Sequence, residues 1–174
     1  MLRDAGVATL VDVRRHPGSR RHPQFGREAL AQALADAAIE YRWEGDALGG
    51  RRRTRPDSRH VAWRSDSFRG YADHMETPDF RAALERVLHA ARERPVAVMC
   101  AERHPSQCHR QLIADAALAW GVPVTHLLEP GRSEPARLHT FARVEGLNVV
   151  YDVQESGVRG QGSASQQSDL VSDS

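Results

Sequence analysis

The sequence predicts an α/β fold: a single three-layer domain with a mostly parallel sheet, Rossmann-like or flavodoxin-like. Short apolar runs rich in β-branched residues alternate with segments whose apolar residues recur at helical spacing, and most connections between them are short. A chain of 174 residues suits one such domain and is too short for two. We therefore expect one domain over residues 1–151 and a disordered tail over residues 152–174, which are mostly Gly, Ser, Gln and Asp.

The first half of the chain reads as a strand, a helix, a strand and a long loop. Residues 8–13 are apolar and end abruptly in charge, which predicts a buried strand. Residues 27–38 have a helical apolar pattern, and residues 39–43 alternate as a second strand does. Residues 44–67 are rich in Gly, Arg, Pro, Asp and Ser, so we expect a long functional loop there.

The next segment is expected to contain three helices and the most apolar strand. A short helix is predicted over residues 68–75, and Thr77 is the predicted N-cap of a helix that runs to about residue 94. Residues 96–100 are wholly apolar, as in a strand buried on both faces of a parallel sheet. A third helix is predicted from residue 105 to residue 120.

The last elements are predicted to extend the same sheet. Residues 122–128 supply a fourth strand. Ser133 is the predicted cap of a helix that runs through residue 145, and residues 147–151 are expected to add an edge strand.

Membrane and secreted classes do not fit this composition. No apolar stretch approaches the roughly 18 residues of a spanning helix, and the N-terminus lacks the apolar core of a signal peptide. Two cysteines do not make a secreted disulfide framework, so we expect reduced thiols and a cytoplasmic protein.

The basic residues point to an anionic ligand. All 24 are arginine, a bias that codon usage explains in part, and the net charge is only +1. Their clustering is more informative than their number. Two predicted loops hold Arg14, Arg15, Arg20 and Arg21, and then Arg51, Arg52, Arg53, Arg55 and Arg59. Guanidinium groups bind phosphate and carboxylate through a rigid bidentate fork, so these loops are candidate anion sites.

The densest set of reactive side chains follows the strand at 96–100. There a strand end and a helix N-terminus favour an anion or a thiolate. We predict Cys108 to be a nucleophile, with Glu102 or His109 as its base. Arg110 is then the anion clamp. Cys100 is either a small buried hydrophobe or a second member of this site.

The first loop offers a second group of candidates. Asp12 ends the first strand, where it would orient an arginine, act as an acid or base, or hold the loop by hydrogen bonds. Arg14, Arg15 and Arg20 would bind the anion. Ser19 has no adjacent base and fits a hydroxyl that contacts phosphate better than a nucleophile.

A glycine pair precedes the second arginine cluster. Gly49 and Gly50 would allow the backbone to approach a ligand closely. Aromatic residues in or near this region would stack on bases if the ligand were a nucleic acid, although core packing suits most of them better. In open α/β sheets ligands bind beyond the carboxyl ends of the strands, so we expect the segments 14–21 and 100–110 to meet at one edge.

Several motifs occur in the order found in one family. They are VDVRR at 11–15, PGSR at 17–20, LGG at 48–50, FRGYADHM at 68–75, MCAE at 99–102 and CHR at 108–110. Over roughly residues 1–128 the chain resembles the bacterial and archaeal family called domain of unknown function 488. The resemblance implies a small cytoplasmic α/β domain in which these polar motifs line one site. Family members usually have a further strand and helix ahead of the position of Leu2, so it also implies either one strand fewer or a start further upstream.

Three functions fit these observations. The leading hypothesis is an enzyme acting on a phosphorylated or nucleotide-like substrate, and the second is a nucleic-acid-binding module that contacts phosphates through both arginine clusters. The third is a metal-binding or redox-sensing protein. Cys100, Glu102, Cys108 and His109 offer mixed ligands, but their spacing matches no closed structural zinc site, so we assign no metal ligands. The motifs identify neither a cofactor nor an oligomeric state.

Overall fold

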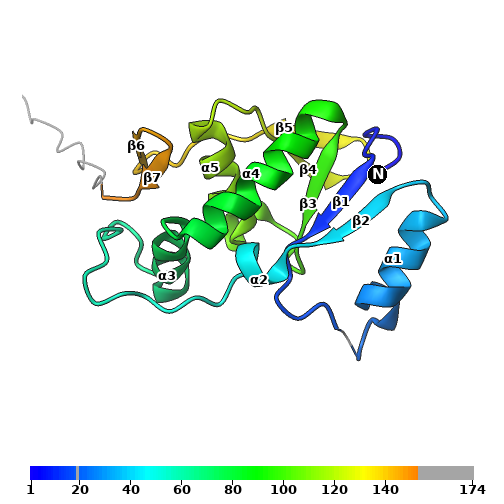
Figure 1. The fold of residues 1–174 in the computed structure, drawn as a ribbon, viewed down its shortest axis with the longest axis horizontal. Coiled ribbons are helices and arrows are strands. Elements are labelled where there is room, and N and C mark those ends of the chain that lie inside the picture. Colours follow the sequence, from blue (N-terminus) through cyan, green and yellow to red (C-terminus); the bar gives the residue numbers. More distant parts are fainter. Residues whose placement is uncertain (19, 153–174) are drawn as a thin grey trace, which may run out of the picture.

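A three-stranded parallel sheet positions the site in the computed structural model, which describes residues 1–18 and 20–152. Its strands are β1 (Thr9–Asp12), β2 (Glu40–Trp43) and β3 (Val96–Met99), in the order β2-β1-β3. Asp12 is level with both Trp43 and Met99, so all three strands end at one edge. Figure 1 shows the three arrows converging beside α2 (Gly45–Leu48).

The central strand is buried and its neighbours are not fully covered. All four residues of β1 are buried, whereas β2 and β3 are half-buried. The expectation that the strand at 96–100 is buried on both faces is therefore wrong. The strand is apolar as predicted, but it is an edge strand: it pairs with β1 on one side, and among the described residues no strand pairs with its other side.

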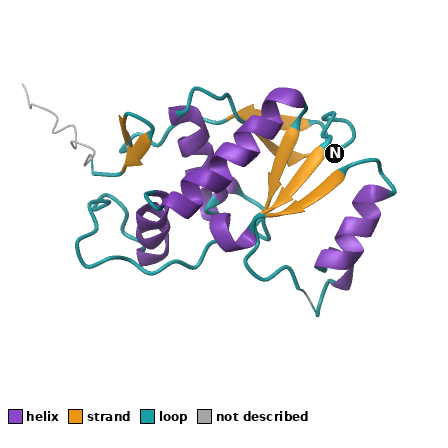
Figure 2. Cartoon of the chain, in the orientation of Figure 1, coloured by secondary structure: helices purple, strands orange, loops and turns teal. Residues whose placement is uncertain are grey.

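Helices pack apolar side chains against both faces of this sheet (Figure 2). Leu10 of β1 packs with Leu30 and Leu34 of α1 (Arg27–Ala35). Val11, whose side chain points to the opposite face, belongs to the larger core cluster with three further helices. These are α3 (Asp66–Met75), α4 (Pro78–Glu93) and α5 (Arg110–Ala119). The α/β prediction is confirmed in this form, while the Rossmann-like or flavodoxin-like assignment stays a prediction.

The predicted N-cap of α4 is confirmed, whereas the predicted long loop at 44–67 differs from the structure. Thr77 caps α4 as predicted, since its side chain accepts a hydrogen bond from the Phe80 backbone N–H at 3.3 Å. The long loop is shorter than expected, because α2 forms inside it and α3 begins at Asp66. Two short 3-10 helices, η1 (Pro23–Phe25) and η2 (Pro105–Gln107), complete the helical elements of the described residues.

For residues 122–145 the predicted strand is confirmed at Thr125–Glu129, but its place in the parallel sheet and the helix predicted at 133–145 are wrong. Two antiparallel hairpins occupy the end of the described chain: β4 (Thr125–Glu129) with β5 (Arg132–Pro135), and β6 (Arg143–Glu145) with β7 (Asn148–Val150). No fourth parallel strand and no helix at 133–145 form within the described residues. Pro130-Gly131 supplies a tight turn, with Gly131 at φ 76°, and Gly146 turns the second hairpin at φ 62°.

The predicted edge strand at 147–151 exists as β7, but it pairs with β6 rather than with the parallel sheet. Val149, Val150 and Tyr151 are buried there. The single domain predicted over residues 1–151 stays a prediction. The structure describes the chain as far as residue 152, so the predicted disordered tail, apart from that first residue, lies outside the described residues. In the part of the chain that the structure describes, no helix combines the length and the apolar character needed to cross a membrane.

Candidate functional site

The loops after β1, α2 and β3 surround a cavity of about 470 Å³. Its volume is within the range of small-molecule sites. The lining residues are Arg14, Arg15, His16, Gly18, Gly50, Arg51, Ser67, Phe68, Tyr71, Cys100, Ala101, Glu102, Gln107, Cys108 and His109. Segments from 14 onward and from 100 onward therefore do meet at the carboxyl edge of the sheet, where the sequence predicts them to lie.

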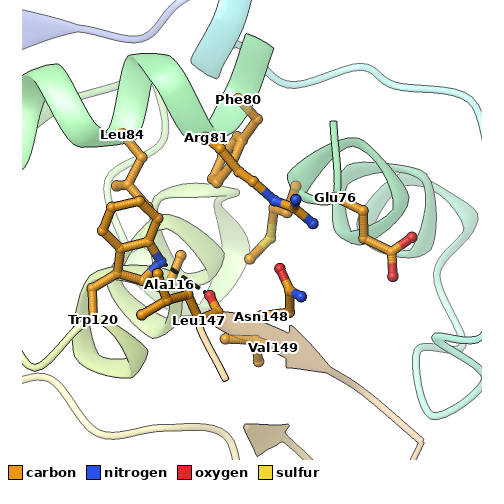
Figure 3. Close-up of a pocket in the computed structure, with 10 residues that line it drawn as sticks. Glu76, Phe80, Arg81, Leu84, Ala116, Trp120, Leu147, Asn148 and Val149 are labelled. Atoms are coloured by element: carbon orange, nitrogen blue, oxygen red, sulfur yellow. Dashed lines mark hydrogen bonds between the residues drawn. The ribbon is translucent and has the colours of Figure 1, made fainter. Parts of the chain in front are cut away.

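A second hollow is too small to compete with this cavity. It measures about 10 Å³ and is bordered by residues of α3, α4, α5 and β7 (Figure 3). Trp120 closes one side, where its indole N–H donates to the Leu147 carbonyl at 3.0 Å. A space of this size holds about one water molecule. We therefore place the candidate site in the larger cavity.

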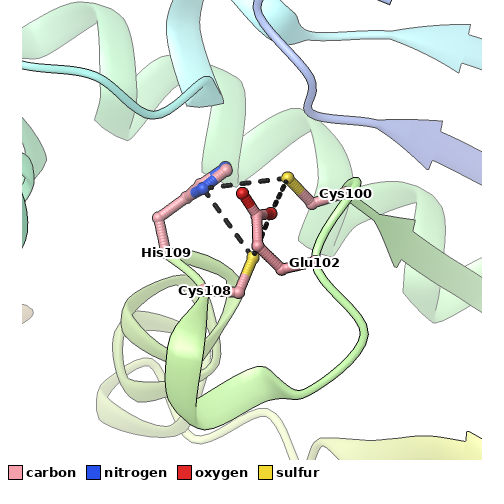
Figure 4. Close-up of side chains that lie close together, drawn as sticks. All are labelled: Cys100, Glu102, Cys108 and His109. Carbon is pink, nitrogen blue, oxygen red and sulfur yellow. Dashed lines mark hydrogen bonds between the residues drawn. The ribbon is translucent and has the colours of Figure 1, made fainter. Parts of the chain in front are cut away.

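Four predicted site residues gather in the wall of the larger cavity. The reactive atoms of Cys100, Glu102, Cys108 and His109 all lie within 4.8 Å of one another, and their side chains point toward one another (Figure 4). Glu102 Oε2 lies 2.7 Å from Cys100 Sγ and 3.2 Å from Cys108 Sγ. His109 Nδ1 lies 4.0 Å from Cys100 Sγ and 3.8 Å from Cys108 Sγ.

Cys108 lies directly before a helix, not within its first turn as predicted. The helix expected at 105–120 is divided into η2 and α5, and Cys108 between them has extended dihedral angles. Its Sγ accepts hydrogen bonds from the backbone N–H of Arg110 at 3.5 Å and from Arg110 Nε at 3.3 Å. The sulfur is thus held by two donors of one residue while it faces the cavity.

The two thiols differ in acidity. A hydrogen bond from Cys100 is the main cause that lowers the pKa of Cys108 to about 5, and contacts with His109 and Arg110 act in the same direction against burial. The hydrogen bond with Cys108, burial and the neighbouring Glu102 raise the pKa of Cys100. The first proton lost by the pair therefore leaves Cys108, whose sulfur alone accepts from Arg110.

Glu102 is a carboxylate in this setting. Burial raises its pKa, but hydrogen bonds from both thiols outweigh burial, and the net pKa is lowered. Arg110 also holds the loop that carries Glu102, because Arg110 Nη2 donates to the Glu102 carbonyl and to the Arg103 carbonyl. Arg110, the predicted anion clamp, is not among the residues that line the cavity, and its contacts hold Cys108 and the loop.

His109 packs closely against Tyr71 and Gly50. The Tyr71 ring lies 4.9 Å from the His109 ring, centroid to centroid. A Cβ at Gly50 would come within 3.0 Å of His109 Nδ1, and one at Gly49 would collide with the Gly45 carbonyl at 2.1 Å. Gly50 lines the cavity, and that the glycine pair lets the backbone approach a ligand stays a prediction. His109 Nε2 is buried without a hydrogen-bond partner.

Asp12 is buried and fully engaged. Its carboxylate accepts from Arg14 Nε at 2.9 Å, Arg14 Nη2 at 2.6 Å, the Arg14 backbone N–H at 3.0 Å and the Tyr41 hydroxyl at 2.8 Å. This pairing raises the pKa of Arg14, and burial together with Asp12 raises the pKa of Tyr41 to about 12. Of the roles considered for Asp12, these contacts favour orienting an arginine.

Only some of the residues predicted to bind the anion line the cavity. Arg14 and Arg15 line the cavity, and Arg15 Nη1 donates to the Arg51 carbonyl at 3.4 Å. Arg20 is exposed and does not line it. Ser19 lies outside the described residues.

Several lining residues were not predicted. Arg51 was noted only as part of a cluster, and its φ of 60° places it in the left-handed region that non-glycine residues rarely adopt. Phe68 and Tyr71, from α3, form the aromatic wall. Their membership in the FRGY motif was a usable signal, because that motif stands among the polar motifs quoted above. Nothing in the local sequence marks His16 or Gln107.

Comparisons with known proteins identify a family and no nearer relative. No curated protein and no solved structure matches the chain. The model of one family matches residues 1–117, a span that contains β1, the cysteine cluster and most of α5. The chain therefore belongs to the family described as domain of unknown function DUF488.

Proposed function

We propose that the protein is an enzyme that acts on a small phosphorylated or nucleotide-like anion bound in the cavity at the carboxyl edge of the sheet. The observation that carries this proposal is the position of Cys108. Its sulfur accepts from two donors of Arg110 and faces a cavity of about 470 Å³ that is also lined by arginines. A hydrogen-bonded thiol beside cationic groups is the setting of a reactive cysteine.

The anion is held by arginines of two segments. Arg15 and Arg51 line the cavity and lie side by side, since Arg15 Nη1 donates to the Arg51 carbonyl. Arg14 also lines the cavity, but its guanidinium is engaged by Asp12 and by the Phe25 carbonyl, so it contributes positive charge rather than a free bidentate donor. Guanidinium groups from different loops suit the several oxygens of a phosphate. Phe68 and Tyr71 also line the cavity, which suits a ligand with an aromatic or apolar portion.

The chemical step is nucleophilic. Cys108 Sγ, a thiolate at neutral pH because its pKa is lowered to about 5, forms a bond to the electrophilic atom of the substrate while the bond to the leaving group breaks. The leaving group takes a proton from solvent, and Glu102, with Oε2 3.2 Å from the sulfur, then accepts a proton from the water molecule that breaks the sulfur–substrate bond and restores the thiolate. His109, with Nδ1 3.8 Å from the sulfur, is the second acid or base in reach. A reducing cytoplasm would keep both thiols in the form this step needs.

Arginine contacts favour a small ligand over nucleic acid. In the second cluster, Arg52 donates to the Gly49 carbonyl, Arg55 pairs with Glu76, and Arg59 pairs with Glu145. Guanidiniums engaged in this way are less available to a phosphate backbone. A nucleic-acid-binding module would therefore rely on few of the arginines that suggested it.

The test is protection of a thiol by a ligand. Iodoacetamide is expected to modify Cys108 before Cys100 in the full chain, as mass spectrometry of the digested protein can show. Inorganic phosphate and nucleoside monophosphates are expected to slow this modification. Arg15→Ala should abolish the protection, whereas Arg132→Ala, a change at an exposed arginine of β5, should retain it.

A turnover assay completes the test. Release of product from a panel of phosphate esters and nucleotides is expected to require Cys108 and to survive Arg132→Ala. If Cys108 reacts no faster than Cys100 and phosphate gives no protection, the proposed function is wrong. Binding that weakens steeply with salt and is unaffected by Cys108→Ser would support nucleic-acid binding instead.

A further inference from the structure

The four side chains of the cysteine cluster present their donor atoms to one point (Figure 4). An ion at the centre of a tetrahedron with two sulfur ligands, one nitrogen and one oxygen would set its ligand atoms about 3.6 Å apart, given usual zinc–ligand bond lengths. The sulfur–nitrogen separations here are 3.8 and 4.0 Å, and the sulfur–oxygen separations are 3.2 and 2.7 Å. The sulfur–nitrogen separations are within about 0.4 Å of the tetrahedral value, whereas the sulfur–oxygen separations are shorter, so an ion enters this group of donors when the Glu102 carboxylate moves outward by up to about 1 Å.

The charges of the cluster favour a cation. Glu102 is a carboxylate, and one of its oxygens lies within hydrogen-bond distance of both sulfurs. When either thiol loses its proton, two anionic atoms face each other at about that distance. Arg110 compensates from one side only, through Cys108. A divalent ion between the donors would convert this repulsion into coordination.

Three of the four donors, those of Cys100, Cys108 and His109, are also held in place without a ligand. Cys100 follows β3 directly, and Cys108 is fixed by two hydrogen bonds from Arg110. Gly50 and Tyr71 both pack against the His109 ring, whose Nδ1 lies 3.8 and 4.0 Å from the two sulfurs. A site with this degree of preorganisation loses little conformational freedom when an ion enters.

We propose that Cys100, Glu102, Cys108 and His109 bind one thiophilic divalent cation of the zinc class. With four protein ligands the site is closed, so the metal-bound protein and the protein with a free Cys108 thiol are alternative states of one site. On binding, Cys100 releases its thiol proton to solvent, Cys108 binds as the thiolate that it already is at neutral pH, and two metal–thiolate bonds form. The existence of the site is independent of the proposed function, whereas the inference that metal blocks catalysis rests on it.

The first measurement uses Co²⁺ as the probe. The full chain, purified without a histidine tag and stripped by a chelator, is titrated with Co²⁺. We expect one ion per chain, sulfur-to-cobalt charge-transfer absorption in the near ultraviolet, and the intense visible bands of tetrahedral Co²⁺. Zn²⁺ should displace it. Weak octahedral bands, or no bound ion, would overturn the proposal.

Matched variants test the ligand set. Cys100→Ser and His109→Gln are expected to lower Co²⁺ affinity by about 100-fold or more. His104→Gln changes an exposed histidine outside the cluster and should leave the affinity unchanged. Circular dichroism shows which variants fold. Equal affinity in a folded Cys100→Ser or His109→Gln variant would rule out this ligand set.

A third measurement needs no variant and separates the two proposals. Zn²⁺ is expected to protect both thiols of the wild-type chain from iodoacetamide. Rapid modification of Cys108 that phosphate slows but Zn²⁺ does not would overturn the metal site and leave the proposed function standing. Tetrahedral metal binding without phosphate protection or turnover would leave the site standing and end the proposed function. Full turnover by the zinc-loaded protein would overturn the alternation between the two states.

Discussion

Gly50 packs against His109 so closely that a Cβ at position 50 would lie 3.0 Å from His109 Nδ1. Gly50→Ala should push the imidazole away from the two sulfurs and lower the free energy of unfolding by about 1 kcal/mol. It should also slow iodoacetamide modification of Cys108. Gly18→Ala is the control, because Gly18 lines the same cavity but a Cβ there has no heavy atom within 4 Å. Equal effects of the two changes would contradict the packing argument.

Asp12→Asn should be strongly destabilising. Asp12 is fully buried and the side chain of its partner Arg14 is only 10% exposed, so the change leaves a largely buried guanidinium without its carboxylate. We expect the free energy of unfolding in urea to fall by about 3 kcal/mol. Glu40→Gln, which removes an exposed pair with Arg42, should cost about 0.5 kcal/mol or less. Similar losses in the two variants would be inconsistent with a buried pair.

Stability should fall in mild acid because of His60. The His60 side chain is fully buried, and burial lowers its pKa below 6.5 despite Glu76 and Asp73 nearby. Its Nδ1 accepts from the Tyr151 backbone N–H, which favours the neutral ring. Below about pH 6.5 the unfolded chain therefore binds a proton that the folded chain does not, and stability declines as pH falls toward the folded pKa.

The measurement is urea denaturation at about pH 7.5 and at about pH 5.5. His60→Gln should reduce the difference between the two free energies. It should not remove the difference, since burial also lowers the pKa of His74 and of His126. An unchanged difference in His60→Gln would assign the pH dependence to other groups.

Arg51→Gly should separate strain from binding. Arg51 and Ala38 both have positive φ, at 60° and 57°, and both are exposed. Glycine adopts a positive φ without steric cost, so Arg51→Gly and the control Ala38→Gly should each raise the free energy of unfolding by about 0.5 kcal/mol. Arg51→Gly alone should weaken phosphate protection of Cys108, by about tenfold. Unaltered protection would remove Arg51 from the anion site.

The parts of the fold that the sequence predicted well have strong local signals. The apolar run of β1, the periodicity of α1 and the Thr77 cap of α4 each depend on a few neighbouring residues. The hairpins were missed because Ser133–Glu145 also fits a helical pattern. The turns at Gly131 and Gly146 override that pattern, and antiparallel pairing is a tertiary outcome that local periodicity does not encode.

For the site, as for the fold, local sequence patterns predicted some features, while contacts between distant segments could not be predicted. That Asp12 and Cys100 lie near each other follows from parallel strands ending at one edge. The contacts of Gly50 with His109 and of Tyr71 with His109 join segments far apart in the chain, and no local pattern specifies them. Arg20 carried the same local signal as Arg15 yet does not line the cavity, because the path of the loop decides which guanidinium faces inward.

The strand order β2-β1-β3 also determines the order in which the sheet can be completed. During synthesis β1 can pair with β2 early, but its other side waits for Val96–Met99, which emerges only after α4. Until then one row of backbone donors and acceptors on β1 has no partner strand, and folding must close a long loop before that row is satisfied. Because the two cysteines follow β3, the cysteine cluster can assemble only after this late step.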